Sequence, residues 1–249
     1  MRVTILGAGT AIPAKQHSPA GISVQAGGEQ LLFDAGPGTL QRLRSVGGNV
    51  FEIDRVFLTH YHVDHCLDVA SLLFARRIPH PARRTPLVIY GPPGLRRFYH
   101  RLNAAFQGWL APRAYPLTLK ELGERSLKFD GYTVSTRWMR HSTKALGYRL
   151  EAGGKRIAYS GDTDACDAIA ELGRNTHLLI LECSHPDERK VAGHLTPTEC
   201  GEIADQANCR RLVLTHFYPV FRGYDIRARV RRHFSGPLIL AQDLTSIRV

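Results

Sequence analysis

A dense group of histidine and aspartate side chains is the part of this 249-residue sequence that most directly predicts chemistry. The group occupies six consecutive positions and comprises His60, His62, Asp64 and His65. Imidazole and carboxylate groups are ligands for zinc and similar divalent ions. His60 and His62 can point the same way from an extended chain, whereas Asp64 and His65 turn away and favour a second ion. A surface loop that is rich in histidine by chance is the alternative, but neither solubility nor a turn calls for three histidines here.

The segments on both sides of this group predict where it lies. Residues 55–58 form a short apolar run of the kind found in buried strands, and residues 66–74 are apolar at helical spacing. The group is therefore expected on the turn between the end of a strand and the start of a helix, where α/β sheets place their sites. Because one loop cannot close two metal sites, the remaining ligands must come from other parts of the chain.

Further candidates stand at the ends of other predicted strands. His216 lies in segment 211–217, an apolar strand that ends Leu-Thr-His-aromatic and thereby repeats the pattern of segment 55–61. Asp162 ends a predicted strand in the same way as Asp34 does. This internal repeat predicts two similar α/β halves that face each other across the site.

The ligand set predicted from these positions would hold two ions. Taken alone, His141 is more often a core or surface histidine, but it ends a predicted strand and the first ligand group is one member short. Asp162 has two oxygens and can bridge two cations. We therefore predict two groups of three ligands joined by one bridge: His60, His62 and His141; Asp64, His65 and His216; and Asp162. A closed structural zinc site would instead use cysteine or a single complete ligand set.

Such a pair of ions predicts a hydrolase. Each ion would keep an open position for solvent, as catalytic zinc does. A hydroxide held between two dications is a nucleophile at neutral pH, and the pair also stabilises both oxygens of an in-line displacement at phosphorus. Zinc suits the histidines, although manganese or iron could occupy a mixed nitrogen and oxygen site. Carboxylic and sulfate esters (a lactone, a β-lactam or an aryl sulfate) are alternative substrates, and an RNA-binding protein with a vestigial site is a third reading.

The HxHxDH pattern of residues 60–65 resembles the signature of the metallo-β-lactamase superfamily, and the other ligand candidates extend this resemblance over nearly the whole chain. The resemblance implies an α/β fold, an αββα sandwich of two similar halves, in a single hydrolase domain spanning residues 1–249. Within the superfamily the chain looks like the ribonuclease Z branch of phosphodiesterases. The features that carry this likeness are Asp34 on a glycine turn, Glu182 at a strand end and His194-Leu195-Thr196 ahead of a helix.

The same resemblance implies roles beyond metal binding. His194 would donate a proton to the leaving oxygen, Glu182 would orient His194, and Asp64 would double as a base. His194 could instead simply belong to the helix start. Asp34 could hold a ligand histidine from behind, or cap the helix expected over residues 39–46, or do both. The resemblance also implies an anionic phosphoester substrate, for which RNA is one candidate, and a homodimer.

Two features depart from the families that the chain resembles. Ribonuclease Z enzymes carry a long inserted arm that grips tRNA, and 249 residues leave no room for it. The chain also resembles the small cyclic-phosphate phosphodiesterases of phosphonate metabolism, through His194 and the Cys-Ser-His-Pro segment 183–186. Those usually carry a cysteine-based zinc site near the N-terminus, whereas no cysteine precedes Cys66 here.

The formal charge of +11 is unevenly distributed. Residues 69–120 contain no aspartate or glutamate, and arginine binds phosphate through paired donors and charge, so a surface that attracts a polyanion or a phosphoester is expected. Solubility, or an arginine-rich genome, is the alternative. The arginines of this segment and of a second cluster are Arg76, Arg77, Arg83, Arg84, Arg96, Arg97, Arg101 and Arg113, and Arg227, Arg229, Arg231 and Arg232.

Composition sets the remaining limits. Hydrophobic residues make up 43% of the chain, which suits one domain with a large core. No apolar stretch approaches the ~18 residues of a membrane span, and the N-terminus has no signal-peptide run. The five cysteines are odd in number and form no CxxC, so free thiols in a reducing cytoplasm are expected. Trp109 and Tyr115 lie in a loop that could stack a base or could simply pack.

Overall fold

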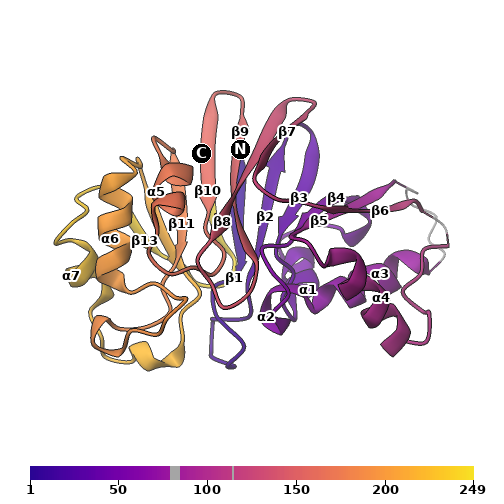
Figure 1. Ribbon diagram of the computed structural model, residues 1–249, viewed down its shortest axis with the longest axis horizontal. Coiled ribbons are helices and arrows are strands. Elements are labelled where there is room, and N and C mark those ends of the chain that lie inside the picture. Colours follow the sequence, from indigo (N-terminus) through magenta and orange to yellow (C-terminus); the bar gives the residue numbers. More distant parts are fainter. Residues whose placement is uncertain (79–84, 114) are drawn as a thin grey trace.

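The computed structural model describes residues 1–78, 85–113 and 115–249. Arg83 and Arg84 of the acid-free segment therefore lie outside the described residues. Two sheets of seven strands each lie at the centre of the molecule, and helices cover them on the two outer sides (Figure 1). The two ends of the chain meet, because the amino group of Met1 donates a hydrogen bond to the Val249 carbonyl at 3.1 Å.

The first sheet comes from the N-terminal half of the chain together with the last strand. Strands β3 to β6 of this sheet run parallel to one another, and the others are antiparallel to their neighbours. In spatial order the strands are β14 (Thr245–Arg248), β1 (Arg2–Gly7), β2 (Gly21–Ala26), β3 (Glu29–Phe33), β4 (Ile53–Phe57), β5 (Leu87–Gly91) and β6 (Leu117–Glu121).

The second sheet comes from the C-terminal half and repeats this plan. Strands β10 to β13 run parallel, whereas β7 to β10 form an antiparallel meander. In spatial order the strands are β13 (Leu238–Leu240), β12 (Leu212–Thr215), β11 (Leu178–Glu182), β10 (Lys155–Tyr159), β9 (Ala145–Ala152), β8 (Tyr132–Met139) and β7 (Arg125–Phe129).

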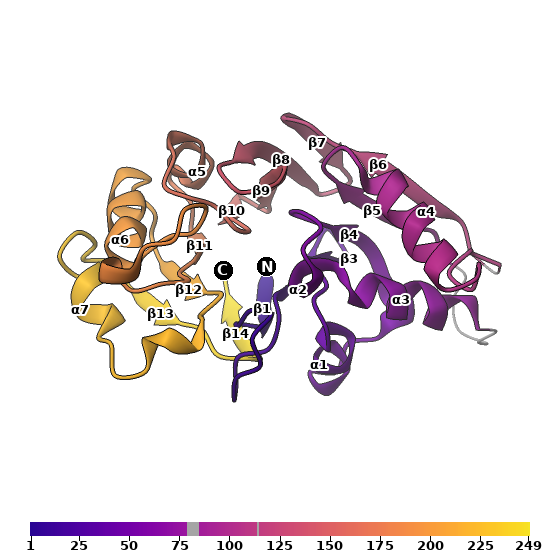
Figure 2. The same cartoon turned by 60° about the horizontal axis from the view of Figure 1, so that its bottom comes forward.

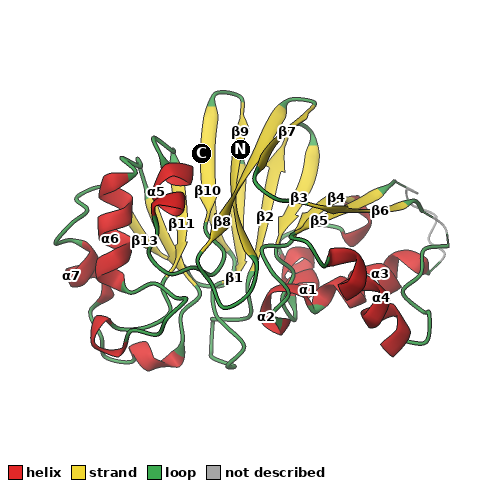
Figure 3. Cartoon of the chain, in the orientation of Figure 1, coloured by secondary structure: helices red, strands yellow, loops and turns green. Residues whose placement is uncertain are grey.

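The helices divide between the halves in the same way (Figure 3). The first half carries α1 (Thr39–Ser45), α2 (Val63–Cys66), α3 (Asp68–Arg77) and α4 (Leu95–Ala105). The second half carries α5 (Asp167–Gly173), α6 (Pro197–Gln206) and α7 (Ile226–Val230). Short 3₁₀ turns complete the described structure at η1 (Val50–Glu52), η2 (Asp187–Arg189) and η3 (Pro219–Phe221). None of the described helices is both long enough and apolar enough to cross a bilayer.

Three apolar clusters hold these layers together. The central cluster lies between the two sheets, where the rings of Phe33 and Phe57 each meet the ring of Tyr148 at 5.6 Å between centroids. The two outer clusters pack the helices of each half against the outer face of its own sheet. Figure 2 shows the two halves side by side, each with its helices outward. The predicted αββα sandwich of two similar halves is confirmed.

The helix starts follow from local sequence, with one correction. Thr196 caps α6 as expected, with Pro197 at the first helical position, and Glu199 completes a capping box by reaching back to the Thr196 amide. The expected alternative that Asp34 caps the 39–46 helix is wrong. The N-cap of α1 is Gly38, which has a φ of 83° and provides no side-chain cap, and the Asp34 carboxylate lies elsewhere.

Candidate metal centre

The first group of predicted ligands assembles around one oxygen of Asp162. Nε2 of His60 lies 3.8 Å and Nε2 of His141 lies 3.9 Å from Asp162 Oδ2. His62 joins them, with its Nδ1 3.3 Å from His141 Nε2. All four side chains place a ligand atom within 4.8 Å of one another. These residues come from both halves of the sandwich, because His60 and His62 follow β4 whereas His141 follows β8.

The second group assembles around the other oxygen of the same carboxylate. Nε2 of His65 lies 3.2 Å and Nε2 of His216 lies 3.4 Å from Asp162 Oδ1. Asp64 Oδ2 lies 3.5 Å from His216 Nε2 and 3.9 Å from His65 Nε2. Asp162 therefore stands between the two groups with one oxygen toward each, which is the arrangement of a bridging carboxylate.

Three of the histidines are held through Nδ1, which allows Nε2 to face this centre as a ligand atom. A neutral imidazole that donates from one ring nitrogen is an acceptor or ligand at the other. His65 Nδ1 donates to Asp34 Oδ2 at 2.8 Å, and His141 Nδ1 donates to the Gly193 carbonyl at 2.9 Å. His216 Nδ1 lies 3.0 Å from the hydroxyl of Ser184, which itself donates to Glu182 Oε2 and so accepts from the imidazole. Each Nε2 is then free to bind a cation.

Two observations show that the donor set fits divalent ions. Nε2 of His65 and Nε2 of His216 lie 3.1 Å apart, close enough to share one proton or to bind one cation. Buried His60 Nε2 and buried Asp162 Oδ1 have no hydrogen-bond partner among the described residues, although burying an unpaired polar atom is costly. Imidazole nitrogens and carboxylate oxygens are ligands for zinc, manganese and iron.

The electrostatics of the centre favour a positive charge. Burial opposes ionisation of Asp162, but the charges of His216 and His65 outweigh burial and hold its pKa well below the usual range. Burial likewise opposes protonation of His65, but Asp162 and Asp34 outweigh it and raise the His65 pKa well above 6.5, so the carboxylates draw to this ring a proton that a bound cation would replace. His60 has its pKa lowered by burial and therefore stays neutral, as a ligand must.

Asp34 holds the centre from behind. Its carboxylate accepts hydrogen bonds from the Thr59 amide at 2.7 Å, from Tyr159 Oη at 2.9 Å and from His65 Nδ1. Its φ of 56° is a left-handed conformation that the tight turn after β3 imposes. The expectation that Asp34 positions a ligand histidine therefore agrees with its contacts. Thr59, Tyr159 and Ser184 were not expected at the site, and only their places near strand ends could have suggested them.

A sixth histidine, His194, lies at the edge of the centre outside these two groups, although one of its ring nitrogens lies within 4.8 Å of ligand atoms of Asp162 and His216. His194 Nδ1 lies 3.0 Å from Glu182 Oε1, and its ring stacks against the ring of His216 at 5.9 Å between centroids. Burial would lower the His194 pKa, but the hydrogen bond and charge of Glu182 raise it above 6.5. Because Glu182 contacts Nδ1, the other ring nitrogen of His194, Nε2, is the one that remains available to another group.

Some arginines of the arginine-rich segments bind groups of the protein itself, so composition alone overstates how many are available to an electropositive surface. Arg76 is buried and donates to the carbonyls of residues 50, 51 and 53, and Arg77 donates to the Ala111 carbonyl at 2.6 Å. Arg229 pairs with Glu188 at 2.6 Å. These guanidinium groups hold loops in place. Tyr115 is also buried, under the Arg76 guanidinium, whereas Trp109 is exposed.

Comparison with known proteins identifies the family. Residues 29–217 match the family described as the beta-lactamase superfamily domain. The chain is 30% identical to a ribonuclease Z of Methanosarcina acetivorans, with 87% of each chain covered, and 31% identical to a ribonuclease Z of Pyrococcus horikoshii, with 88% and 87% covered. The chain belongs to the metallo-β-lactamase superfamily, as a ribonuclease Z-like member.

Solved structures agree with this family. The metallo-β-lactamase fold protein YhfI of Bacillus subtilis superposes with a TM-score of 0.84 at 26% identity, covering 99% of this chain and 98% of YhfI. The short form of human tRNase Z superposes with a TM-score of 0.81 at 25% identity, covering 100% and 99%. The prediction of a ribonuclease Z-like, metal-dependent hydrolase is thereby confirmed, and phosphodiesters are favoured over carboxylic and sulfate esters.

Proposed function

We propose that this protein is a ribonuclease Z-like phosphodiesterase that cleaves RNA at a centre of two divalent ions, with zinc as the native metal. The observation that carries the proposal is Asp162, which turns one oxygen toward each of two histidine groups at 3.2 to 3.9 Å. Bound there, the ions would ionise a water at neutral pH and stabilise charge on the phosphoryl oxygens. The proposed ligands are His60, His62, His141, Asp64, His65, His216 and Asp162.

Proton transfer and its positioning are assigned to side chains of the protein. His194, held by Glu182 and outside both ligand groups, would donate a proton to the leaving oxygen. Glu182 also accepts from the Thr163 amide at 2.8 Å, so its position is fixed, and it keeps the proton of His194 on Nδ1 or supports the doubly protonated ring. Asp64 suits a ligand better than a base, because His216 and His65 hold its pKa far below the usual range despite burial.

Metal-dependent turnover is the direct test. Purified protein is assayed with bis-p-nitrophenyl phosphate and with an RNA that carries a 3′ extension, before and after removal of metal with a chelator. Turnover of both substrates that is lost with the chelator and restored by zinc is expected. The His62→Ala variant should lose turnover, whereas His233→Ala, an exposed histidine near Glu202, should keep it. A metal-loaded protein that hydrolyses neither phosphodiester would refute the proposal.

A homodimer is proposed as the assembly. Apolar side chains on α3 and in the turn after α4 are exposed, including Phe74 at 43% and Trp109 at 54%, with their rings 6.2 Å apart. A second copy would cover them. Light scattering should give twice the chain mass for the wild type and the single mass for Phe74→Lys with Trp109→Lys. Val191→Lys, at a comparably exposed apolar position of the other half, is the control that should stay dimeric. A monomeric wild type would overturn the dimer.

The cytoplasm is the proposed compartment. All five cysteines are free thiols in the structure, and four of them are buried. Thiols in such number suit a reducing compartment.

A further inference from the structure

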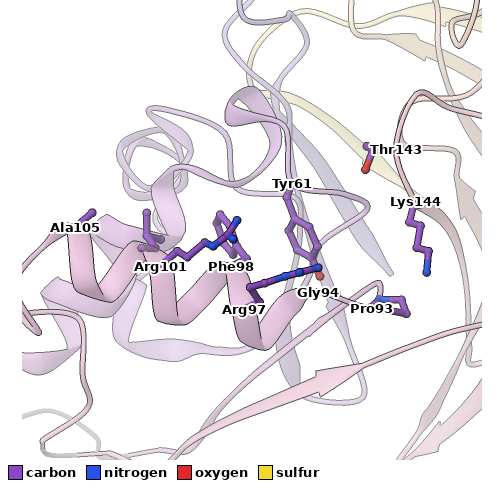
Figure 4. Close-up of a pocket in the computed structure, with 10 residues that line it drawn as sticks. Tyr61, Pro93, Gly94, Arg97, Phe98, Arg101, Ala105, Thr143 and Lys144 are labelled. Atoms are coloured by element: carbon purple, nitrogen blue, oxygen red, sulfur yellow. The ribbon is translucent and has the colours of Figure 1, made fainter.

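A cavity opens between α4 and the turn after β8, and its lining includes Tyr61, which lies between two proposed metal ligands in the sequence (Figure 4). It has a volume of about 600 Å³, which lies in the range of small-ligand sites. One wall is α4 with the turn before it, and the opposite wall is the turn between β8 and β9. The residues that the argument uses are Tyr61, Arg97, Phe98, Arg101 and Lys144.

Both walls continue directly from proposed metal ligands. Tyr61 is the residue between His60 and His62, and Lys144 follows His141 by three positions. The Tyr61 ring stacks on Phe98 of α4, with centroids 5.0 Å apart and planes 16° apart. The Tyr61 hydroxyl donates to the Pro92 carbonyl at 2.5 Å, just before α4. A group that leaves the metal centre past Tyr61 therefore enters this cavity.

Three cations line the cavity, and none is neutralised within the described part of the chain. Arg97, Arg101 and Lys144 are exposed, and none forms an ion pair or a side-chain hydrogen bond with a described residue. Arg97 and Arg101 are four apart on one helix, so both side chains lie on the same face. Lys144 faces them from the opposite wall (Figure 4).

The backbone of α4 does not supply the attraction for an anion. Glu121 Oε1 accepts from the Gly94 amide at 3.0 Å and from the Arg96 amide at 3.1 Å, so the amino end of α4 already holds a carboxylate. The attraction of the cavity for an anion therefore comes from the side chains of Arg97, Arg101 and Lys144. Arg76 and Arg77 of the same acid-free segment instead donate hydrogen bonds to backbone carbonyl groups. The cations of the cavity differ from them in having no such partner among the described residues.

We propose that this cavity binds a backbone phosphate of the polynucleotide substrate next to the scissile phosphate. Guanidinium groups bind phosphate through paired donors, and an ammonium group adds a point charge. The cavity would thereby make a second phosphate a requirement for efficient cleavage. This inference rests on the proposed function, because it assigns the neighbouring subsite of the same centre.

The test uses substrates with one scissile bond and one added phosphate. The dinucleotide UpU is compared with UpU that carries a 5′-terminal phosphate and with UpU that carries a 3′-terminal phosphate. Because each added phosphate lies one nucleotide from the scissile one, one of the two should raise kcat/KM of the wild type by about tenfold or more. In the Arg97→Ala, Arg101→Ala double variant this gain should fall below about twofold.

Matched variants and a binding measurement complete the design. Arg96→Ala removes an exposed arginine from the same helix outside the cavity and should keep the gain. The Arg97→Lys, Arg101→Lys double variant keeps the positive charge and should retain part of the gain in kcat/KM. For metal-free protein, fluorescence anisotropy of a labelled single-stranded RNA should show a salt slope that is smaller by about 0.7 in the double alanine variant, which is the contribution of one lost phosphate contact.

The outcomes separate this inference from the proposed function. Wild-type protein that hydrolyses bis-p-nitrophenyl phosphate and UpU, but gains nothing from either added phosphate, would overturn the subsite and leave the phosphodiesterase intact. A gain that persists in the double alanine variant, with an unchanged salt slope, would overturn it as well. Metal-loaded protein with no phosphodiesterase activity at all would remove the proposed function and the subsite together.

Discussion

Oε1 of Glu182 lies 3.0 Å from Nδ1 of His194, at the rim of a centre whose other histidines turn a nitrogen inward. Glu182 is 1% exposed and is fixed by the Thr163 amide and the Ser184 hydroxyl. The same Ser184 hydroxyl accepts from His216. One buried carboxylate thus orients the proposed proton donor and, through one hydroxyl, a proposed metal ligand.

This relationship predicts that His194→Ala affects substrates according to their leaving group. Cleavage of RNA expels a ribose oxygen that needs a proton, so kcat should fall by about 10²–10⁴. Hydrolysis of bis-p-nitrophenyl phosphate expels a stable phenolate and should fall by less than about tenfold. Steady-state kinetics on both substrates gives the comparison. Equal losses on the two substrates would show that His194 has another role.

A glycine beside the bridging carboxylate gives a prediction about stability. Gly161 has a φ of 59°, and a Cβ there would lie 2.6 Å from Cγ2 of Thr59, a residue that donates to Asp34. Gly161→Ala should lower the free energy of unfolding by more than the ~1–2 kcal/mol of a left-handed alanine, because backbone and Thr59 must shift as well.

The control for this prediction is Gly153→Ala. Gly153 has a φ of 54°, and a Cβ added there meets no atom within 4 Å, so only the conformational cost applies. Urea denaturation monitored by circular dichroism measures both variants. Equal midpoints for the two variants would mean that the contact between Gly161 and Thr59 imposes no constraint on the site.

The carboxylate of Asp243 predicts a dependence of stability on pH. It accepts from the Ala8 amide at 3.0 Å, from the Ser18 amide at 2.9 Å and from Arg42 Nε at 3.1 Å. Burial raises the Asp243 pKa, but the Ser18 and Ala8 hydrogen bonds and the Arg42 charge outweigh it, so the pKa lies below the usual 3.8 of an aspartate.

Because the folded-state pKa is depressed, this stabilisation is complete above the unfolded pKa and is lost as the pH falls through the folded pKa. Asp243→Asn should therefore cost about 1–3 kcal/mol at pH 7 and progressively less below pH ~4. Thermal unfolding of both proteins from pH 7 down to pH 3 gives the difference. A difference that stays constant, or grows on acidification, would show that the charge of Asp243 is not responsible.

The sequence predicted the centre better than its surroundings, for physical reasons. His60, Asp162 and His216 could be found because ligand chemistry restricts residue type and α/β folds place such residues at strand ends. The contacts of Ser184 could not be predicted from the sequence, because a serine near a strand end is common and the partners of its hydroxyl depend on side-chain positions. The acid-free segment suggested one basic surface, whereas Arg76 satisfies buried carbonyls, which composition does not reveal.

The cavity between α4 and the turn after β8 shows the same limit. Arg97 and Lys144 are 47 positions apart and lie on opposite walls of it only because α4 and the turn after β8 meet across the two halves. A spacing along the chain indicates neighbours within one helix, such as Arg97 and Arg101. It does not indicate which helix faces which turn.

The most direct test of the central claim is to locate metal in crystals of the purified protein. Anomalous scattering at the zinc edge should show two peaks per chain, one among His60, His62 and His141 and one among Asp64, His65 and His216, with Asp162 between them. Metal analysis should give about two ions per chain, and Asp162→Ala should reduce that number. Zinc-supplemented crystals with no anomalous peak among these side chains, or with a single ion that leaves one group empty, would contradict the account.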